Sequence, residues 1–136
     1  MAKYLMLKHY RTTTPTPNEF APMDQWTPEE CEAHFQFMRD YAARLEATGE
    51  MVGGEGLSPE GTWVRSGRAG EPAIVDGPFA ETKDLIAGWF IIDVDSYDRA
   101  LELARELSDA PGQGGEPIHE WLELREIMSA PPTIDQ

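Results

Sequence analysis

The chain has 136 residues, which suits one compact domain with a single hydrophobic core. Hydrophobic residues make up 40% of it and charged residues 26%, an ordinary balance for a globular protein, but 25 acidic against 11 basic residues give a formal charge of −14. Phosphate backbones and anionic lipid surfaces repel such a chain, so we expect neither a nucleic-acid nor a membrane partner.

The first predicted element is a strand over residues 3–10. Alternation divides its apolar side chains between two faces, with Leu5 and Leu7 on one and Tyr4 and Met6 on the other. Residues 11–26 contain three prolines and show no periodicity. They predict a loop, which either covers a site or makes a loose excursion over the surface.

A helix is predicted between Thr27 and Gly49. Thr27 can cap the first turn, Pro28 suits the first helical position, and Glu30 completes a capping box. Gly49 is a natural stop. The expected buried stripe consists of Cys31, Phe35, Met38, Ala42 and Leu45, at spacings of three and four.

Four strand segments follow, over residues 51–57, 62–66, 72–75 and 89–94. The last of these is the clearest, with Phe90, Ile92 and Val94 on one face and Trp89 and Ile91 on the other. Because both of its faces are apolar, we expect this strand to be covered on both sides.

Asp95 and Ser96 offer caps for a second helix. Its expected buried stripe consists of Tyr97, Ala100, Leu101, Ala104 and Leu107. A final strand is predicted over residues 118–127, and a loose tail follows it. The chain is therefore divided into one domain over residues 1–128 and a C-terminal tail over residues 129–136.

The order of elements is typical of a ferredoxin-like α+β sandwich, an antiparallel sheet with two helices on one face. The other face would carry Tyr4, Met6 and one side of residues 89–94. Such an apolar patch indicates an association surface, and a second copy stacked sheet to sheet would bury it. We therefore expect a homodimer.

Residues 76–83, between two predicted strands, combine a turn with a cluster of ionisable groups. Gly77 and Pro78 account for the turn. Asp76 is either a catalytic or orienting carboxylate or a turn residue that binds nearby backbone N–H groups. Glu81 and Lys83 are two residues apart and would project together, either toward an anionic or carbonyl substrate or as a surface ion pair.

The same segment, Asp-Gly-Pro-Phe-Ala-Glu-Thr-Lys, resembles the signature of the DGPF branch of the YCII-related proteins. Residues 52–57, 88–95 and 123–125 resemble further blocks of that family. The resemblance implies a dimeric α/β barrel. In the DGPF branch the activity is mostly undetermined, and gene neighbours that are sigma factors imply a sigma factor as partner.

The wider YCII group is suspected of hydrolytic or dehalogenating chemistry that uses a His and an Asp. The family's His lies about eleven residues before the glycine that ends the first helix, where this chain has Met38. His34 lies one helical turn earlier, on nearly the same face. It is either a general base or a hydrogen-bonded helix residue at the edge of the buried stripe.

Other candidates have a structural alternative as well. His9 lies near the end of the first strand, beside the loop. Trp63 and Arg65 would share a strand face, which suits stacking on a flat ligand or simple packing. His119 is predicted on the same strand face as Trp121, Glu123 and Arg125. Cys31 lies in an apolar stripe, where a buried thiol is commoner than a nucleophile.

Cys31 is the only cysteine, so no disulfide can form within the chain, which fits a reducing compartment. No apolar run approaches the roughly 18 to 20 residues that span a bilayer, and the short apolar stretch before Lys8 does not resemble a secretory leader. We expect a cytoplasmic protein. The sequence has no metal-ligand spacing and no nucleotide fingerprint, so no metal or cofactor is expected.

Together these patterns predict a cofactor-independent enzyme that uses acid–base chemistry on a small polar or aromatic molecule. Asp76 and His34 are the expected catalytic pair, and Lys83 or Arg65 would stabilise charge. The expected substrate contacts include Glu81, Trp63 and His9. One alternative is a non-catalytic module that binds a metabolite or a protein such as a sigma factor, and another is a purely structural dimer.

Overall fold

The computed structural model describes residues 2–9, 23–58, 62–64, 66–70, 74–75 and 86–128. At residues 63, 74 and 75 it describes the main chain alone. Its body consists of strands β1 (Ala2–His9), β2 (Met51–Gly56), β5 (Ile86–Val94) and β6 (Leu122–Glu126) and helices α1 (Pro28–Thr48) and α2 (Tyr97–Ser108). Two short 3-10 helices are η1 (Met23–Gln25) and η2 (Gln113–Gly115), and a separate ribbon pairs β3 (Trp63–Val64) with β4 (Ile74–Val75).

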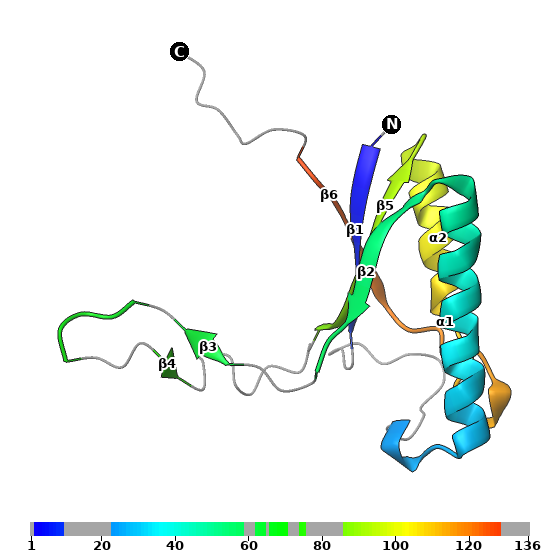
Figure 1. Cartoon of the computed structure of the whole chain (residues 1–136), viewed down its shortest axis with the longest axis horizontal. Helices are drawn as coiled ribbons and strands as arrows, with labels where there is room; N and C mark the ends of the chain where they lie inside the picture. The colour runs from blue at the N-terminus through cyan, green and yellow to red at the C-terminus, as the bar shows by residue number, and fades with distance from the viewer. Residues whose placement is uncertain are drawn as a thin grey trace.

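The four strands of the body form one antiparallel sheet in the order β2-β5-β1-β6. The central strands β1 and β5 pair along the whole of β1, from Ala2 opposite Val94 to His9 opposite Ile86. Both helices lie on the same face of this sheet (Figure 1). The strand order and the one-sided helices confirm the predicted ferredoxin-like α+β fold.

Helix α1 begins and ends where its capping pattern predicts. The Glu30 N–H donates to the Thr27 hydroxyl at 3.1 Å, and the Thr27 N–H donates to the Glu30 carboxylate at 2.8 Å. At the other end Gly49 has a φ of 80°, a left-handed conformation that glycine adopts without steric cost. These two caps fix where α1 begins and ends.

The faces of β1 are the reverse of the prediction. Tyr4 and Met6, expected on the open face, point toward the helices and are 8% and 0% exposed. Leu5 and Leu7 lie on the open face and are partly exposed. Alternation pairs these side chains correctly, but both faces of the strand are apolar, and so nothing in its own sequence marks which one meets the helices.

The core fills the space between the sheet and the helices. Tyr41 of α1 is buried there, and its hydroxyl donates to the Leu103 carbonyl of α2 at 2.8 Å, which ties the two helices together. The buried core residues are Tyr4, Met6, Tyr41, Leu45, Ile92, Val94, Ala100, Leu103 and Leu107.

The apolar stripes of both helices differ from the predicted ones. Phe35 is 46% exposed, although it was expected in the stripe of α1. In α2, Tyr97 is exposed and Leu103 is buried instead. The true stripe of α1 passes through His34 and Tyr41, two residues with polar atoms that a hydrophobicity pattern does not select.

The last strand is shorter than predicted, because residues 118–121 lie outside β6. His119 has a φ of 56°, which is uncommon for a residue with a side chain, and its N–H donates to the Ser108 carbonyl at 2.9 Å. Strand β6 therefore begins only at Leu122. His119 precedes the strand and does not share a strand face with Glu123, which corrects that prediction.

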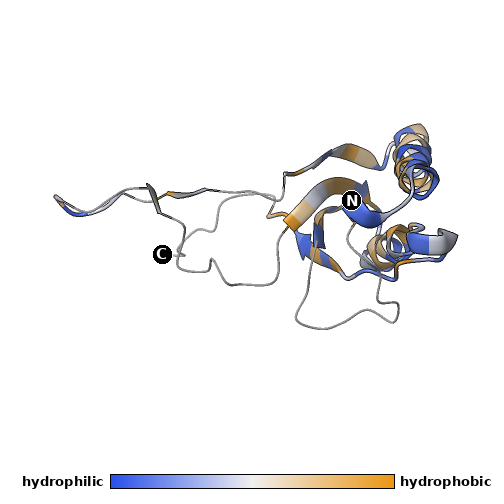
Figure 2. Ribbon diagram, turned by 90° about the horizontal axis from the view of Figure 1, so that it is seen from below, coloured by the Kyte–Doolittle hydropathy of each residue, from blue (hydrophilic) through white to orange (hydrophobic). Residues whose placement is uncertain are grey.

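The ribbon of β3 and β4 falls within the two predicted strand segments 62–66 and 72–75. Trp63 pairs with Val75 and Val64 with Ile74. The ribbon stands apart from the main sheet, on the side away from the helices, in both views (Figures 1 and 2). An isolated two-stranded ribbon is only marginally stable in water.

Gly54 of β2 is explained by packing. A Cβ at this position would lie 2.5 Å from a ring carbon of Phe90 and 2.8 Å from the Trp89 carbonyl oxygen, closer than real Cβ atoms come. The family-like block over residues 52–57 therefore includes a position where the aromatic ring of the neighbouring strand needs glycine.

Candidate functional site

His34 is a buried polar residue in the second turn of α1, and only 4% of it is exposed. Its ring makes edge-on contacts with the rings of Trp26 and Phe35, each at 5.8 Å between centroids. Nδ1 lies 3.0 Å from the Pro111 carbonyl oxygen. Because burial of an unpaired imidazole would be costly, this hydrogen bond is what makes the position tolerable for a histidine.

The bond to Pro111 also fixes the tautomer of His34. A carbonyl oxygen can only accept, so Nδ1 carries the hydrogen and Nε2 of the neutral ring keeps a lone pair that can accept. That lone pair faces the Lys8 ammonium, with Nε2 and Nζ 3.4 Å apart. His34 thus has the form that a general base requires.

Lys8 lies between His34 and a buried carboxylate. Its Nζ is 3.2 Å from Glu120 Oε1, and both side chains are 12% exposed. The Met38 sulfur, a weak acceptor, is 3.8 Å from the same nitrogen. We call His34, Lys8 and Glu120 the His34 cluster.

The folding of two separate segments explains how this cluster forms. Lys8 is the last inward-facing position of β1, after Ala2, Tyr4 and Met6, so alternation directs its side chain toward the helices. Glu120 follows the left-handed residue His119, and its carbonyl accepts a hydrogen bond from the Ser108 hydroxyl at 2.7 Å. The connection between α2 and β6 thereby places the Glu120 carboxylate beside Lys8 at the end of β1.

Burial and charge set the protonation of the cluster. Burial, with the Lys8 charge as a smaller cause, holds the pKa of His34 below its ordinary value of 6.5, so the ring is neutral at pH 7. Burial raises the pKa of Glu120, and the Lys8 ammonium opposes that rise. The cluster therefore combines a neutral base with an ammonium group and its counter-ion.

The other predicted site residues do not join the His34 cluster in the described part of the chain. His9 lies on the open face of the sheet, where its Nε2 is 3.5 Å from Glu123 Oε1. The remaining candidates lie outside what the structure describes. This holds for the whole of Asp76, Glu81, Lys83 and Arg65, and for the side chain of Trp63.

Sequence reasoning missed Lys8 and Glu120. The sequence places Lys8 on the same strand face as Tyr4 and Met6, but it does not show that this face meets the helices, so Lys8 could not be selected from it. Glu120 could not be selected either, because its position depends on the backbone conformation of the residue before it.

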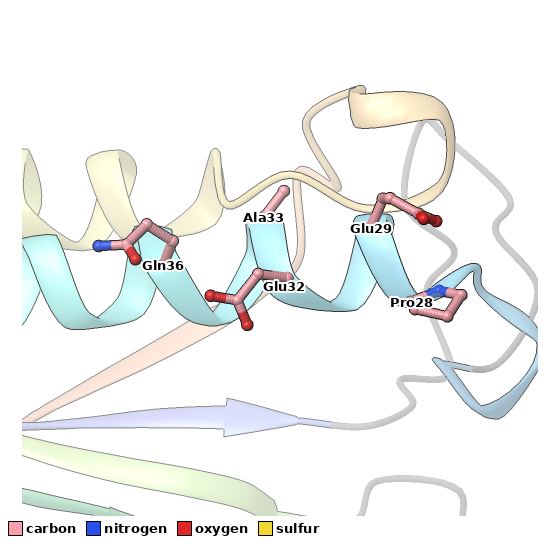
Figure 3. A pocket seen from close by; sticks show the side chains of 5 residues that line it. All are labelled: Pro28, Glu29, Glu32, Ala33 and Gln36. Carbon is pink, nitrogen blue, oxygen red and sulfur yellow. The ribbon is translucent and has the colours of Figure 1, made fainter.

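A shallow depression on the surface of α1 is not part of this site (Figure 3). Its lining residues project from the side of the helix opposite His34, and Glu32 and Gln36 are exposed. The lining consists of Pro28, Glu29, Glu32, Ala33 and Gln36. These groups face solvent and do not converge on a point where a reacting atom could lie.

Two further properties concern the described residues alone. Within them, no three or more His, Cys, Asp or Glu side chains are placed to hold a metal ion. None of the helices in the same part of the chain is long and apolar enough to cross a membrane.

Comparison with known proteins identifies the family. The model of the YCII-related domain matches residues 2–115, which include α1, both central strands, Lys8 and His34. An uncharacterized protein of Rhizobium meliloti (strain 1021) is 55% identical over 42 residues, 31% of this chain. The aligned part is 34% of that relative, so the chain covers about a third of its length. The chain belongs to the YCII-related domain family.

Proposed function

We propose that this YCII-related protein is an enzyme that uses His34 as a general base on a small polar or aromatic molecule. The observation that carries the proposal is the neutral, buried His34 ring whose unprotonated Nε2 faces the Lys8 ammonium at 3.4 Å. A substrate proton, from a hydroxyl, an activated C–H or an attacking water, would move to Nε2. The negative charge left on a substrate oxygen would be stabilised by Lys8, and the reaction needs no cofactor.

Glu120 supports this role by keeping a cation in a buried position. An ammonium group with 12% of its side chain exposed needs a partner to stay charged, and Glu120 is that partner at 3.2 Å. A substrate oxygen could take the place beside Nζ that is now held by Nε2 or by the Met38 sulfur. Lys8 would then contact both its counter-ion and the substrate.

The segment over residues 76–83 keeps the roles predicted for it. It ends three residues before Ile86, and Ile86 pairs in the sheet with His9, the neighbour of Lys8. Covalent geometry therefore allows the segment to reach the end of the sheet where the His34 cluster lies. We assign Asp76 to acid–base work beside His34, Lys83 and Arg65 to charge stabilisation, and Glu81 and Trp63 to substrate contacts. His9, which pairs with Glu123 on the open face of the sheet, is not assigned to that site. We also place the chain in the DGPF branch.

We further propose that the functional unit is a homodimer that pairs through the open face of the sheet. Four half-buried apolar side chains form the centre of that face, with Leu5 opposite Ile91 and Leu7 opposite Trp89. Acidic and basic groups border them, Glu55 on β2 and Glu123 and Arg125 on β6. An apolar centre with a polar rim is what an association surface requires.

The test is a thermal-shift screen of small carbonyl compounds, esters and halogenated acids, followed by turnover assays on every compound that stabilises the protein. We expect at least one of them to be converted, and His34→Gln to lower kcat by roughly 10²–10⁴-fold. Arg39→Gln, an exposed position one to two turns further along α1, is the matched control and should change kcat less than about twofold.

Three outcomes would contradict the proposal. Compounds that stabilise the protein and are never converted would indicate a binding module for a metabolite. No stabilisation by any compound would favour a structural dimer or a module that contacts a protein such as a sigma factor. An unchanged kcat in His34→Gln would remove His34 as the base even if turnover is found.

A further inference from the structure

The connection between α2 and β6 contains a small closed loop over residues 111–117, which we call the η2 loop. The Gly112 N–H donates to the Glu116 carbonyl at 2.8 Å, and the Gly115 N–H donates to the Gly112 carbonyl at 3.0 Å. Pro111 and Pro117 form an isolated bridge at its base. The loop is therefore one hydrogen-bonded unit rather than a run of independent residues.

Helix α1 holds the η2 loop at two points. At the base, the Pro111 carbonyl accepts the hydrogen of His34 Nδ1 at 3.0 Å. At the tip, the Gly114 N–H donates to Glu30 Oε2 at 2.6 Å, and Gly114 has the left-handed φ of 69° that glycine accepts. Glu30 and His34 are four residues apart, so they lie on the same face of α1, one turn apart.

Glu30 makes more contacts than its capping role needs. Oε1 accepts from the Thr27 N–H and completes the capping box, while Oε2 accepts from the Gly114 N–H. The two backbone donors, Gly114 first and Thr27 second, hold the pKa of Glu30 below its ordinary value, so the carboxylate is charged at pH 7. A capping box alone explains the first contact and not the second.

We propose that Glu30 is a positioning residue for His34: by holding Gly114 it keeps the Pro111 carbonyl against Nδ1, so that His34 stays in the tautomer whose Nε2 faces Lys8. The inference rests on the proposed function, because the tautomer of His34 matters for catalysis only if His34 is a base. The contacts of Glu30 and His34 with the η2 loop do not depend on any substrate. Loss of Oε2 would free the tip of the loop, and the Pro111 carbonyl would be held less firmly, from the base of the loop.

The test is the tautomer of His34, read at neutral pH from the ring ¹⁵N shifts and the long-range couplings to the ring protons in the full chain. Wild type should show one ring form, with hydrogen on Nδ1. Glu30→Ala has no acceptor oxygen, so it should lose this single form and show a mixture of tautomers. Glu30→Gln keeps one acceptor oxygen for the two donors and should show a smaller admixture of the second tautomer. Thr27→Ala weakens the same helix start but leaves both Glu30 oxygens in place, and it should keep the wild-type form.

The outcomes separate this inference from the proposed function. A single Nδ1–H form in both Glu30 variants would overturn the positioning role. A mixture in Thr27→Ala as large as in the Glu30 variants would also overturn it, because any weakening of the helix start would then suffice. If the tautomers respond as expected but wild type converts no compound, the positioning role stands and the assignment of His34 as a base fails.

Discussion

The charge balance of the His34 cluster depends on one ammonium group. In Lys8→Met, Glu120 is left buried without a cation, and its pKa rises further as its carboxyl becomes protonated. We expect the free energy of unfolding at pH 7 to fall by about 1–3 kcal/mol. We also expect the pKa of His34 to move part of the way back toward 6.5, because burial is the larger cause of its depression.

Chemical denaturation at several pH values and an NMR titration of His34 measure both effects. The folded pKa of Glu120 lies above its unfolded value of 4.5. The stability lost in Lys8→Met should therefore grow as the pH rises above that folded pKa, where the carboxyl loses its proton, and should shrink as the pH falls toward 4.5. The double variant Lys8→Met/Glu120→Gln removes both charges and should recover most of the stability. A loss that is independent of pH would show that the pair does not interact in this way.

At this scale the sequence could identify His34 as a candidate but not the form of its site. A histidine four and seven residues from other stripe positions is compatible with either burial or exposure, and burial follows only from the Pro111 carbonyl, 77 residues away in the chain. The same limit applies to Glu120, whose direction depends on the left-handed His119. Distant backbone partners of this kind leave no local pattern.

The secondary-structure elements are joined by an ion pair between the start of β2 and α2. Arg99 donates to both oxygens of Glu50, at 2.8 and 2.9 Å, and this contact holds the pKa of Glu50 at about 2. A depressed folded pKa means that the stabilisation is present above the unfolded value of 4.5 and is lost as the pH falls from 4.5 toward 2.

Glu50→Gln should therefore flatten the acid dependence of the unfolding free energy between pH 4.5 and 2. At pH 7 it should cost roughly 1 kcal/mol, because Arg99 is 34% exposed and solvent weakens the pair. Urea unfolding at pH 7, 4.5 and 3 measures both quantities, with Glu46→Gln, an exposed carboxylate in the last turn of α1, as the control. An unchanged acid slope in Glu50→Gln would exclude this pair as a source of acid sensitivity.

The bounds of an element could be predicted where contacts between residues close in the sequence set them. Thr27, Glu30 and Gly49 form contacts within a few residues, so both ends of α1 could be predicted from the sequence. The faces of β1 and the true start of β6 could not, because the first depends on where the helices pack and the second on the hydrogen bond from His119 to Ser108. Local chemistry sets element boundaries, and tertiary packing decides which face is inward.

At the scale of the whole molecule, the open sheet face has to be reconciled with a net charge of −14. Two such chains repel each other, so a dimer must gain more from burying Leu5, Leu7, Trp89 and Ile91 than it loses from like charges. Added salt screens the repulsion and leaves the apolar contact intact. We therefore expect a wild-type dimer whose dissociation constant decreases between low and physiological salt.

Leu5→Glu should convert this dimer to a folded monomer. Position 5 is opposite Arg125 on β6, so a glutamate there can pair within its own subunit and the fold should survive. Across a twofold interface, the same change adds charge to the centre of the apolar contact. Gln36→Glu adds an equal charge on the outer face of α1 and should leave the dimer intact.

Sedimentation velocity at micromolar concentration reports the mass of each variant, and far-UV circular dichroism reports its fold. Wild-type protein that sediments as a single subunit would refute the dimer and leave the apolar centre of the face without a role. Equal weakening by Leu5→Glu and Gln36→Glu would point to net charge rather than the sheet face as the determinant. A contact centred on β1 requires that Leu5→Glu dissociates the dimer and that Gln36→Glu does not, because Leu5 and Leu7, and not Tyr4 and Met6, lie on the open face.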